Sequence, residues 1–145
     1  NTTMALSNGA GGYQIGDGNL GEVSFYNTSA PTALTGASVT ITAADLANGI
    51  CTMDSGSTSA GTYVFPTGAL LDAAFTSLKV GSTFDCAFIN IGDDTANDVT
   101  FTAGTGNTLV GNDIIQDGAT KTANTSGVFR WRKTGDAAYT IYRIA

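Results

Sequence analysis

The sequence contains no histidine and only two cysteines, Cys51 and Cys86. Histidine is the commonest general base, the usual partner of a catalytic nucleophile and the commonest zinc ligand, so the standard forms of these sites are excluded. Two cysteines alone cannot provide the ligands of a structural zinc site. We expect Cys51 and Cys86 to be small buried apolar residues, with a disulfide between them as the alternative.

Charge and long apolar runs are also scarce. Charged residues make up only 12% of the chain, about half of the typical ~25%. The net charge of −6 repels phosphate backbones, so we expect no nucleic-acid partner. No segment reaches the ~18 apolar residues of a membrane span, and no charged and apolar leader is visible. We therefore expect no membrane association and no secretory signal.

The chain of 145 residues has the length of one domain, and glycine, threonine, alanine, serine and asparagine dominate it. This composition is typical of strands and turns. Short alternating segments predict about ten strands, and this pattern is typical of an all-β fold, a β-sandwich or barrel. The expected strands are residues 20–27, 36–43, 50–53, 62–65, 82–91, 98–104, 108–113, 119–123, 128–134 and 139–144.

Helical signals are few. Residues 66–78 carry one apolar face with Thr67 as a candidate N-cap, and residues 42–49 predict a single helical turn that Gly49 ends. We therefore predict a jelly-roll-like β-sandwich over residues 20–145 with one short helix, preceded by an extended arm at residues 1–19. The arm contains the glycine-rich "GAGGYQIGDG", which lacks the following helix of a phosphate-binding loop.

The expected strand at residues 82–91 is apolar on both faces. Phe84, Cys86 and Phe88 lie on one face, whereas Ala87, Ile89 and Ile91 lie on the other. A strand of this kind is usually covered on both sides. We therefore expect a second sheet on one face and the helix on the other.

An acidic stretch, "NIGDDTANDVTFTAGTG", follows this strand and contains Asp93, Asp94 and Asp98. It could be a metal site, a catalytic carboxylate pair or a turn. The spacing lacks the glycine and the closing glutamate of a calcium loop. A polar loop also offers no apolar pocket for a catalytic acid. Because aspartate and asparagine favour turns, we predict a hairpin connection.

The C-terminal segment predicts a hairpin, with "GDAA" as its turn. Four of the six basic residues of the chain lie in residues 130–145. Arginines beside aromatic residues are typical of interfaces, so head-to-tail contact between copies is one interpretation. The other is a surface strand whose basic groups pair with acidic loops of the same chain.

Residues 37–144 resemble a domain repeated in structural proteins of tailed phages, marine and cyanobacterial phages especially. The motifs are "VTITAADLANGI", "TYVFPTGALLDAAF", "VGSTFDCAFINIGDD", "VTFTAGTGNTLVGN" and "SGVFRWRKTGDAAYTIYRI". The start, "MALSNGAGGYQIGDGNLGEV", resembles the N-terminal segments of phage capsid decoration, or cement, proteins. These motifs are structural and none is a catalytic signature.

The resemblance implies a non-enzymatic virion protein, without cofactor or metal, that stabilises the outer surface of the phage head as a homotrimer bound to the major capsid protein. We expect capsid contact through the arm, at Tyr13, Ile15, Asp17 and Leu20. We expect contact between the copies at Arg130, Trp131, Arg132 and Arg143. The alternative is a head-fibre or tail-associated module that binds a host surface glycan, for which Tyr26 and Tyr63 are the aromatic candidates. A hydrolase is the third and least supported class, because no histidine and no credible acid pair is present.

Overall fold

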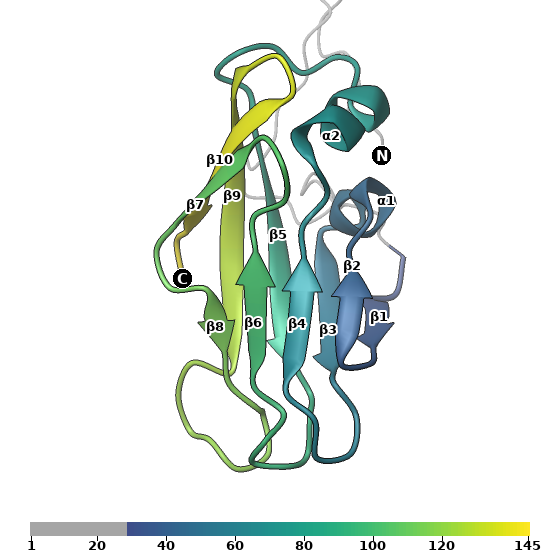
Figure 1. The fold of residues 1–145 in the computed structure, drawn as a ribbon, viewed down its shortest axis with the longest axis vertical. Helices are drawn as coiled ribbons and strands as arrows, with labels where there is room; N and C mark the ends of the chain where they lie inside the picture. Colours follow the sequence, from purple (N-terminus) through teal and green to yellow (C-terminus); the bar gives the residue numbers. More distant parts are fainter. Residues whose placement is uncertain (1–28) are drawn as a thin grey trace, which may run out of the picture.

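The computed structural model describes residues 29–145, which form two sheets, with two helices at one end (Figure 1). The strands of the larger sheet are β1 (Thr32–Thr35), β3 (Ile50–Asp54), β5 (Thr83–Asn90), β7 (Asn107–Val110), β9 (Ser126–Gly135) and β10 (Ala138–Arg143). Those of the smaller sheet are β2 (Ser38–Thr40), β4 (Gly61–Val64), β6 (Val99–Thr102) and β8 (Ile114–Ile115). The strand orders are β1-β3-β5-β9-β10-β7 and β2-β4-β6-β8.

The first six strands alternate between the two sheets. Odd-numbered strands enter the larger sheet and even-numbered strands the smaller one, and within each sheet these strands pair in parallel. The acidic stretch therefore leads from β5 across to the other sheet, and our prediction of a hairpin at this point was wrong. A jelly roll is built from antiparallel strands, so that finer prediction is not confirmed. The mostly β, two-sheet architecture is confirmed.

The predicted C-terminal hairpin is present. β9 and β10 pair in antiparallel order, with Trp131 opposite Ile141, and β9 also pairs in antiparallel order with β5. Several single elements differ from the predicted ones. Residues 119–123 form a turn and bends rather than a strand, and β1 and β8 were not predicted. The expected strand at residues 20–27 lies outside the described residues.

Two helices connect the sheets at the same end of the molecule (Figure 1). α1 (Ala43–Ala47) links β2 to β3, and α2 (Gly68–Ala74) links β4 to β5. Thr42 caps α1 in a capping box with Asp45, and the Thr67 hydroxyl accepts a hydrogen bond from the Leu70 amide. The Thr67 cap was predicted from the sequence, and α1 lies within residues 42–49, which were predicted as a helical turn.

The core lies between the two sheets and is dominated by aromatic side chains. Phe65 occupies its centre, with its ring stacked on Phe101 at 4.7 Å between centroids and edge-on to Trp131 at 5.0 Å. Phe88 and Phe129 complete this cluster, at 5.8 and 5.4 Å from Phe65. All five rings have at most 1% exposure. Such edge-to-face and offset contacts add to the hydrophobic gain of burial.

Only one face of β5 lies in this core. Cys86 and Phe88 are buried, as predicted, whereas Ile89 on the opposite face is 38% exposed. Ile91, just after the strand, is 54% exposed. The expectation that protein covers both faces was wrong for the residues that the structure describes, because the helices sit at the end of the sandwich. The outer face of the larger sheet is therefore apolar in part.

Candidate functional site

The acidic stretch forms a turn that is organised by asparagine. The Asp94 carboxylate accepts a hydrogen bond from the Ala96 amide at 2.9 Å, and the Asn97 side-chain oxygen accepts one from the Asp94 amide at 3.0 Å. Asn97 is fully buried, and its Nδ2 donates to the carbonyls of Ser57 and Ser59, both at 3.0 Å. The stretch therefore has a structural role, because Asn97 joins it to the loop that contains Ser57 and Ser59.

Asp98 takes part in a charged cluster at this end of the molecule. Lys121 Nζ lies 2.6 Å from Asp117 and 3.5 Å from Asp98. Burial raises the pKa of Asp117, but hydrogen bonds from Lys121 and Thr120 outweigh that effect and bring the pKa to about 2. The position between the two carboxylates is thus taken by an ammonium group. Within residues 29–145 no group of three or more potential metal-ligating acids or cysteines is found.

The basic residues of the C-terminal hairpin have partners within the chain. Arg130 forms a bidentate ion pair with Asp85, at 2.8 and 2.9 Å. Lys133 lies 2.9 Å from Asp72. Both pairs lie within one chain, as expected if the basic groups of the hairpin pair with acids of the same chain. Arg132 is exposed and has no hydrogen-bond or ion-pair partner among the described residues.

Arg143 points inward over the Phe129 ring, 5.3 Å from its centroid. Its guanidinium donates to the Asn124 side chain at 2.7 Å, to the Ile114 carbonyl at 3.1 Å and to the Ser126 carbonyl at 3.2 Å. Arg143 therefore joins β10 to β8 and to the loop before β9. This intrachain role leaves little of its charge for a neighbouring copy.

Trp131, which we expected at an interface between copies, has 0% exposure in the single chain and stacks on Phe84 at 5.2 Å. It cannot contact a partner without unfolding of the core, so it is removed from the candidate interface. Tyr63, the aromatic candidate for glycan contact, is also at 0% exposure and donates to the Gly36 carbonyl at 3.1 Å. Tyr13, Ile15, Asp17, Leu20 and Tyr26 lie outside the described residues.

Asp72 on α2 joins this helix to the C-terminal hairpin, a role that was not predicted from the sequence. Its carboxylate accepts hydrogen bonds from Lys133 at 2.9 Å, from the Tyr139 hydroxyl at 2.7 Å and from the Ala137 amide at 2.7 Å. These three bonds lower its pKa to about 2, with Lys133 as the largest cause. Burial and the Asp72 charge raise the pKa of Tyr139. The network fixes α2 against the β9–β10 turn.

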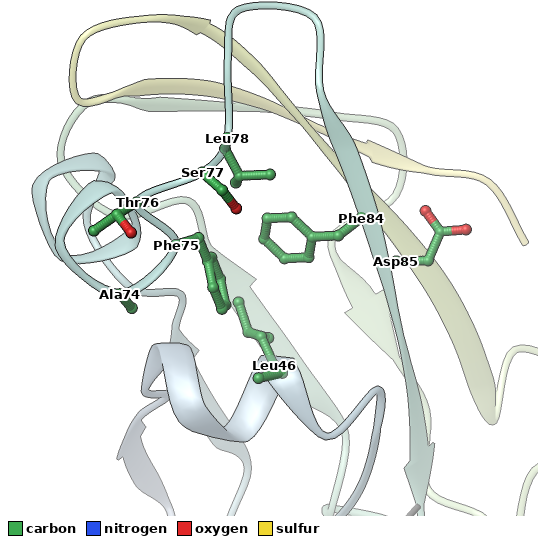
Figure 2. Close-up of a pocket in the computed structure, with 9 residues that line it drawn as sticks. Leu46, Ala74, Phe75, Thr76, Ser77, Leu78, Phe84 and Asp85 are labelled. Carbon is green, nitrogen blue, oxygen red and sulfur yellow. The ribbon is translucent and has the colours of Figure 1, made fainter. Parts of the chain in front are cut away.

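A surface pocket of about 400 Å³ lies between the two helices and β5 (Figure 2). Phe75 and Phe84 meet edge-on in it, with ring centroids 5.0 Å apart. Leu46 from α1 lies below them, and the hydroxyls of Thr76 and Ser77 border the same pocket. Both rings are half-buried, so the pocket has an apolar floor beside polar groups.

The outer face of the larger sheet is another candidate contact surface. Strand register places Ile50, Ala87 and Val128 in one row across β3, β5 and β9, and Val110 beside Tyr142 in another. Val110 and Ile144 are 46% and 48% exposed, in addition to Ile89 and Ile91. The paired charges of Asp85 and Arg130 lie within this face. We use the name outer face for this surface.

The pocket was not predicted from the sequence, and only one feature of the sequence indicated the outer face. Phe75 and Phe84 each fitted a core position of its own element, and their meeting depends on how α2 packs beside β5. In the row of Ile50, Ala87 and Val128, neighbouring residues are 37 and 41 positions apart in the sequence. The one available signal was the apolar outer side of residues 87–91, which we interpreted as a covered surface.

Comparison of the chain with protein-family models, with curated proteins and with solved structures gave no match. Across residues 29–145, neither helix has the length and apolar character that a membrane crossing requires.

Proposed function

We propose that this chain is a non-enzymatic structural protein of a tailed-phage virion, a capsid decoration protein that binds the outer surface of the head and stabilises the shell. The observation that carries the proposal is the outer face, which presents Ile89, Ile91, Val110 and Ile144 to solvent. Exposed apolar side chains gathered on one face of a sheet are typical of contact sites for other proteins. The motif resemblance over residues 37–144 supports the virion as the place where that contact is made.

The distribution of charge on the outer face fits a protein partner. Asp85 and Arg130 neutralise each other by a bidentate pair, so that burying them leaves neither charge unpaired. Arg132 supplies one further cation beside them for an acidic group on a capsid subunit or on a second copy. We propose the homotrimer with Arg132 at the contact between copies and without Trp131.

The arm remains part of the proposal. Residues 1–19, with Tyr13, Ile15, Asp17 and Leu20, would contact the major capsid protein and add to the contact made by the outer face. Linked contacts of three copies raise the overall affinity, because each later contact is intramolecular.

Two measurements test the proposal. Quantitative mass spectrometry of purified virions should give a copy number that is a simple fraction of that of the major capsid protein. In co-sedimentation with capsids that lack the protein, Ile89→Asp/Ile144→Asp should bind much more weakly than the wild type. The control is Thr62→Asp, on the smaller sheet, where the side chain is exposed and no apolar row is present. A few copies per virion would contradict the head location, and equal binding by both variants would contradict capsid contact through the outer face.

The pocket favours one alternative function, a head-fibre or tail-associated module that binds a host surface glycan. Half-buried Phe75 and Phe84 beside the hydroxyls of Thr76 and Ser77 provide the apolar and polar groups that a sugar ring contacts. Titration of the labelled protein with host surface polysaccharide would shift the amide signals of residues 75–78 and 84 if this alternative holds. Unchanged signals at saturating polysaccharide would contradict it.

A further inference from the structure

We propose that residues 22–27 of the same chain form a fifth strand of the smaller sheet, parallel to β2 on its open edge. This inference concerns the fold of the sandwich and is independent of the virion role. Among residues 29–145, β2 pairs only with β4 and lies at the end of the strand order. An open edge presents amide and carbonyl groups that another strand can bind.

The direction of those groups follows from the bonds that β2 already makes. The Ala37 carbonyl accepts from the Thr62 amide at 2.8 Å, and the Ile41 amide donates to the Val64 carbonyl at 2.8 Å. Alternate residues of a strand direct their backbone groups to opposite neighbours. The backbone groups of Ser38 and Thr40 therefore point away from β4, toward the open edge.

The core beside β2 is also incompletely covered. Val39 faces the core in register with Tyr63, yet it is only half-buried, whereas Tyr63 has 0% exposure. At the corresponding edge of the larger sheet, Leu34 on β1 is 5% exposed. The incompletely buried edge of the core therefore lies at β2, in the smaller sheet. A shallow apolar hollow at the carboxyl end of β2 exposes further apolar surface there. It is lined by Thr40, Ile41, Thr42, Ala43, Leu70, Ala73 and Ala74.

The alternation of the strands identifies the occupant. Because β1 to β6 enter the two sheets in turn, the segment before β1 belongs in the smaller sheet, next to β2. Residues 22–27 read "EVSFYN", with Val23 and Phe25 at alternate positions as a strand with one apolar face requires. Facing the core, these two residues would cover Val39.

The connection is long enough. Residues 28–31 join the proposed strand to β1, and four extended residues span about 13 Å, compared with about 10 Å between packed sheets. The end of this connection, just before β1, is fixed at the helical end, where Asn48 Nδ2 donates to the Ala30 carbonyl at 2.8 Å. A parallel strand beside β2 ends at that same helical end (Figure 1). The segment can therefore reach the edge from its own chain.

The test uses the complete wild-type chain and solution NMR. We expect nuclear Overhauser contacts from Val23 or Phe25 to Val39, and hydrogen exchange at the Ser38 and Thr40 amides slowed roughly 100-fold relative to exposed loop amides. Contacts to Leu34 instead would place the segment beside β1 and overturn the proposal. Fast exchange at both amides would overturn it as well.

A mixed sample of labelled and unlabelled chains separates the two possible sources of the strand. Contacts seen only within one chain support the proposal, and contacts only between chains assign the strand to a second copy and overturn it. In Val23→Asp/Phe25→Asp the Ser38 and Thr40 amides should become fast while the Phe88 amide stays slow. The control is Ser24→Asp, whose side chain points to the solvent side of the proposed strand, and it should leave both amides slow. Slow exchange at these amides in the double variant would contradict the proposal.

Discussion

The Asp72 carboxylate accepts a hydrogen bond of 2.7 Å from the hydroxyl of Tyr139, a residue 67 positions further along the chain. This bond joins the helix α2 to the C-terminal hairpin, and Lys133 and Ala137 donate to the same carboxylate. The relationship shows how this low-charge chain uses its few acids. Asp72 joins α2 to the C-terminal hairpin, and Asp98 and Asp117 likewise join separate loops through Lys121.

The stability of the fold should depend on pH in the acid range. The pKa values of Asp72 and Asp117 are about 2, compared with ~3.9 for an aspartate in an unfolded chain. A depressed pKa contributes stability that is complete above the unfolded value and is lost as the pH falls toward the folded value. We expect the free energy of unfolding, from urea titrations, to decrease between about pH 4 and pH 2. The slope should be smaller in Asp72→Asn/Asp117→Asn, and an unchanged slope would contradict this assignment.

Truncation of the central aromatic ring should be costly. Phe65→Ala removes contacts with Phe88, Phe101, Phe129 and Trp131, and we expect a loss of about 3–5 kcal/mol in the free energy of unfolding. The control is Leu70→Ala, at a position that is 55% exposed, which should change stability by less than about 1 kcal/mol. Chemical denaturation of both variants measures the difference, and similar losses would show that Phe65 is not the centre of the core.

A methyl group at position 127 should displace Arg143. A Cβ at Gly127 would lie 2.6 Å from the Arg143 Nε atom, whereas one at Gly135 on the same strand would meet only Ala138 at 4.0 Å. We expect Gly127→Ala to lose about 1–3 kcal/mol of stability and Gly135→Ala to lose much less. In an Arg143→Ala background the cost of Gly127→Ala should nearly vanish. A cost that persists in the double variant would show that the strain arises elsewhere.

The buried amide of Asn97 should not tolerate a carboxylate. Asn97→Asp places negative charge against the carbonyls of Ser57 and Ser59, to which the amide nitrogen now donates. We expect a loss of at least about 2 kcal/mol at neutral pH, because a buried charge is left facing acceptors. The loss should shrink in acid, as the new carboxyl becomes protonated. The control is Asn112→Asp, because an exposed Asn112 uses only its side-chain oxygen, on the Ile114 amide, and that acceptor is retained.

The two cysteines should behave as buried thiols. Both are free, with 0% exposure for Cys51 and 1% for Cys86, and the neighbouring Cys51 together with burial raises the pKa of Cys86. Burial keeps the reagent away from both sulfur atoms, and the raised pKa of Cys86 further reduces its thiolate fraction. We expect Ellman's reagent to detect no thiol in the folded chain and both thiols in denaturant. Two missing thiols in denaturant would indicate the alternative, a disulfide.

Much of the local structure follows from the sequence alone. Thr67 caps α2 as predicted, α1 lies within the predicted turn at residues 42–49, and the alternating Val99 and Phe101 of β6 point into the core. Asp94 and Asn97 form the predicted turn. These features depend on groups within three or four residues of one another. Local sterics and hydrogen bonding are sufficient to determine them.

The strand order, the partners of the charged residues and the contact surfaces were decided only by the tertiary structure. Arg130 finds Asp85 across 45 residues, and the pocket forms where Phe75 meets Phe84. The alternation of a strand indicates which side chains share a face, but not which strand lies beside it or whether that face is covered. Those choices are made when the two sheets pack, because the free energy of burying the aromatic core depends on the whole arrangement rather than on any one segment.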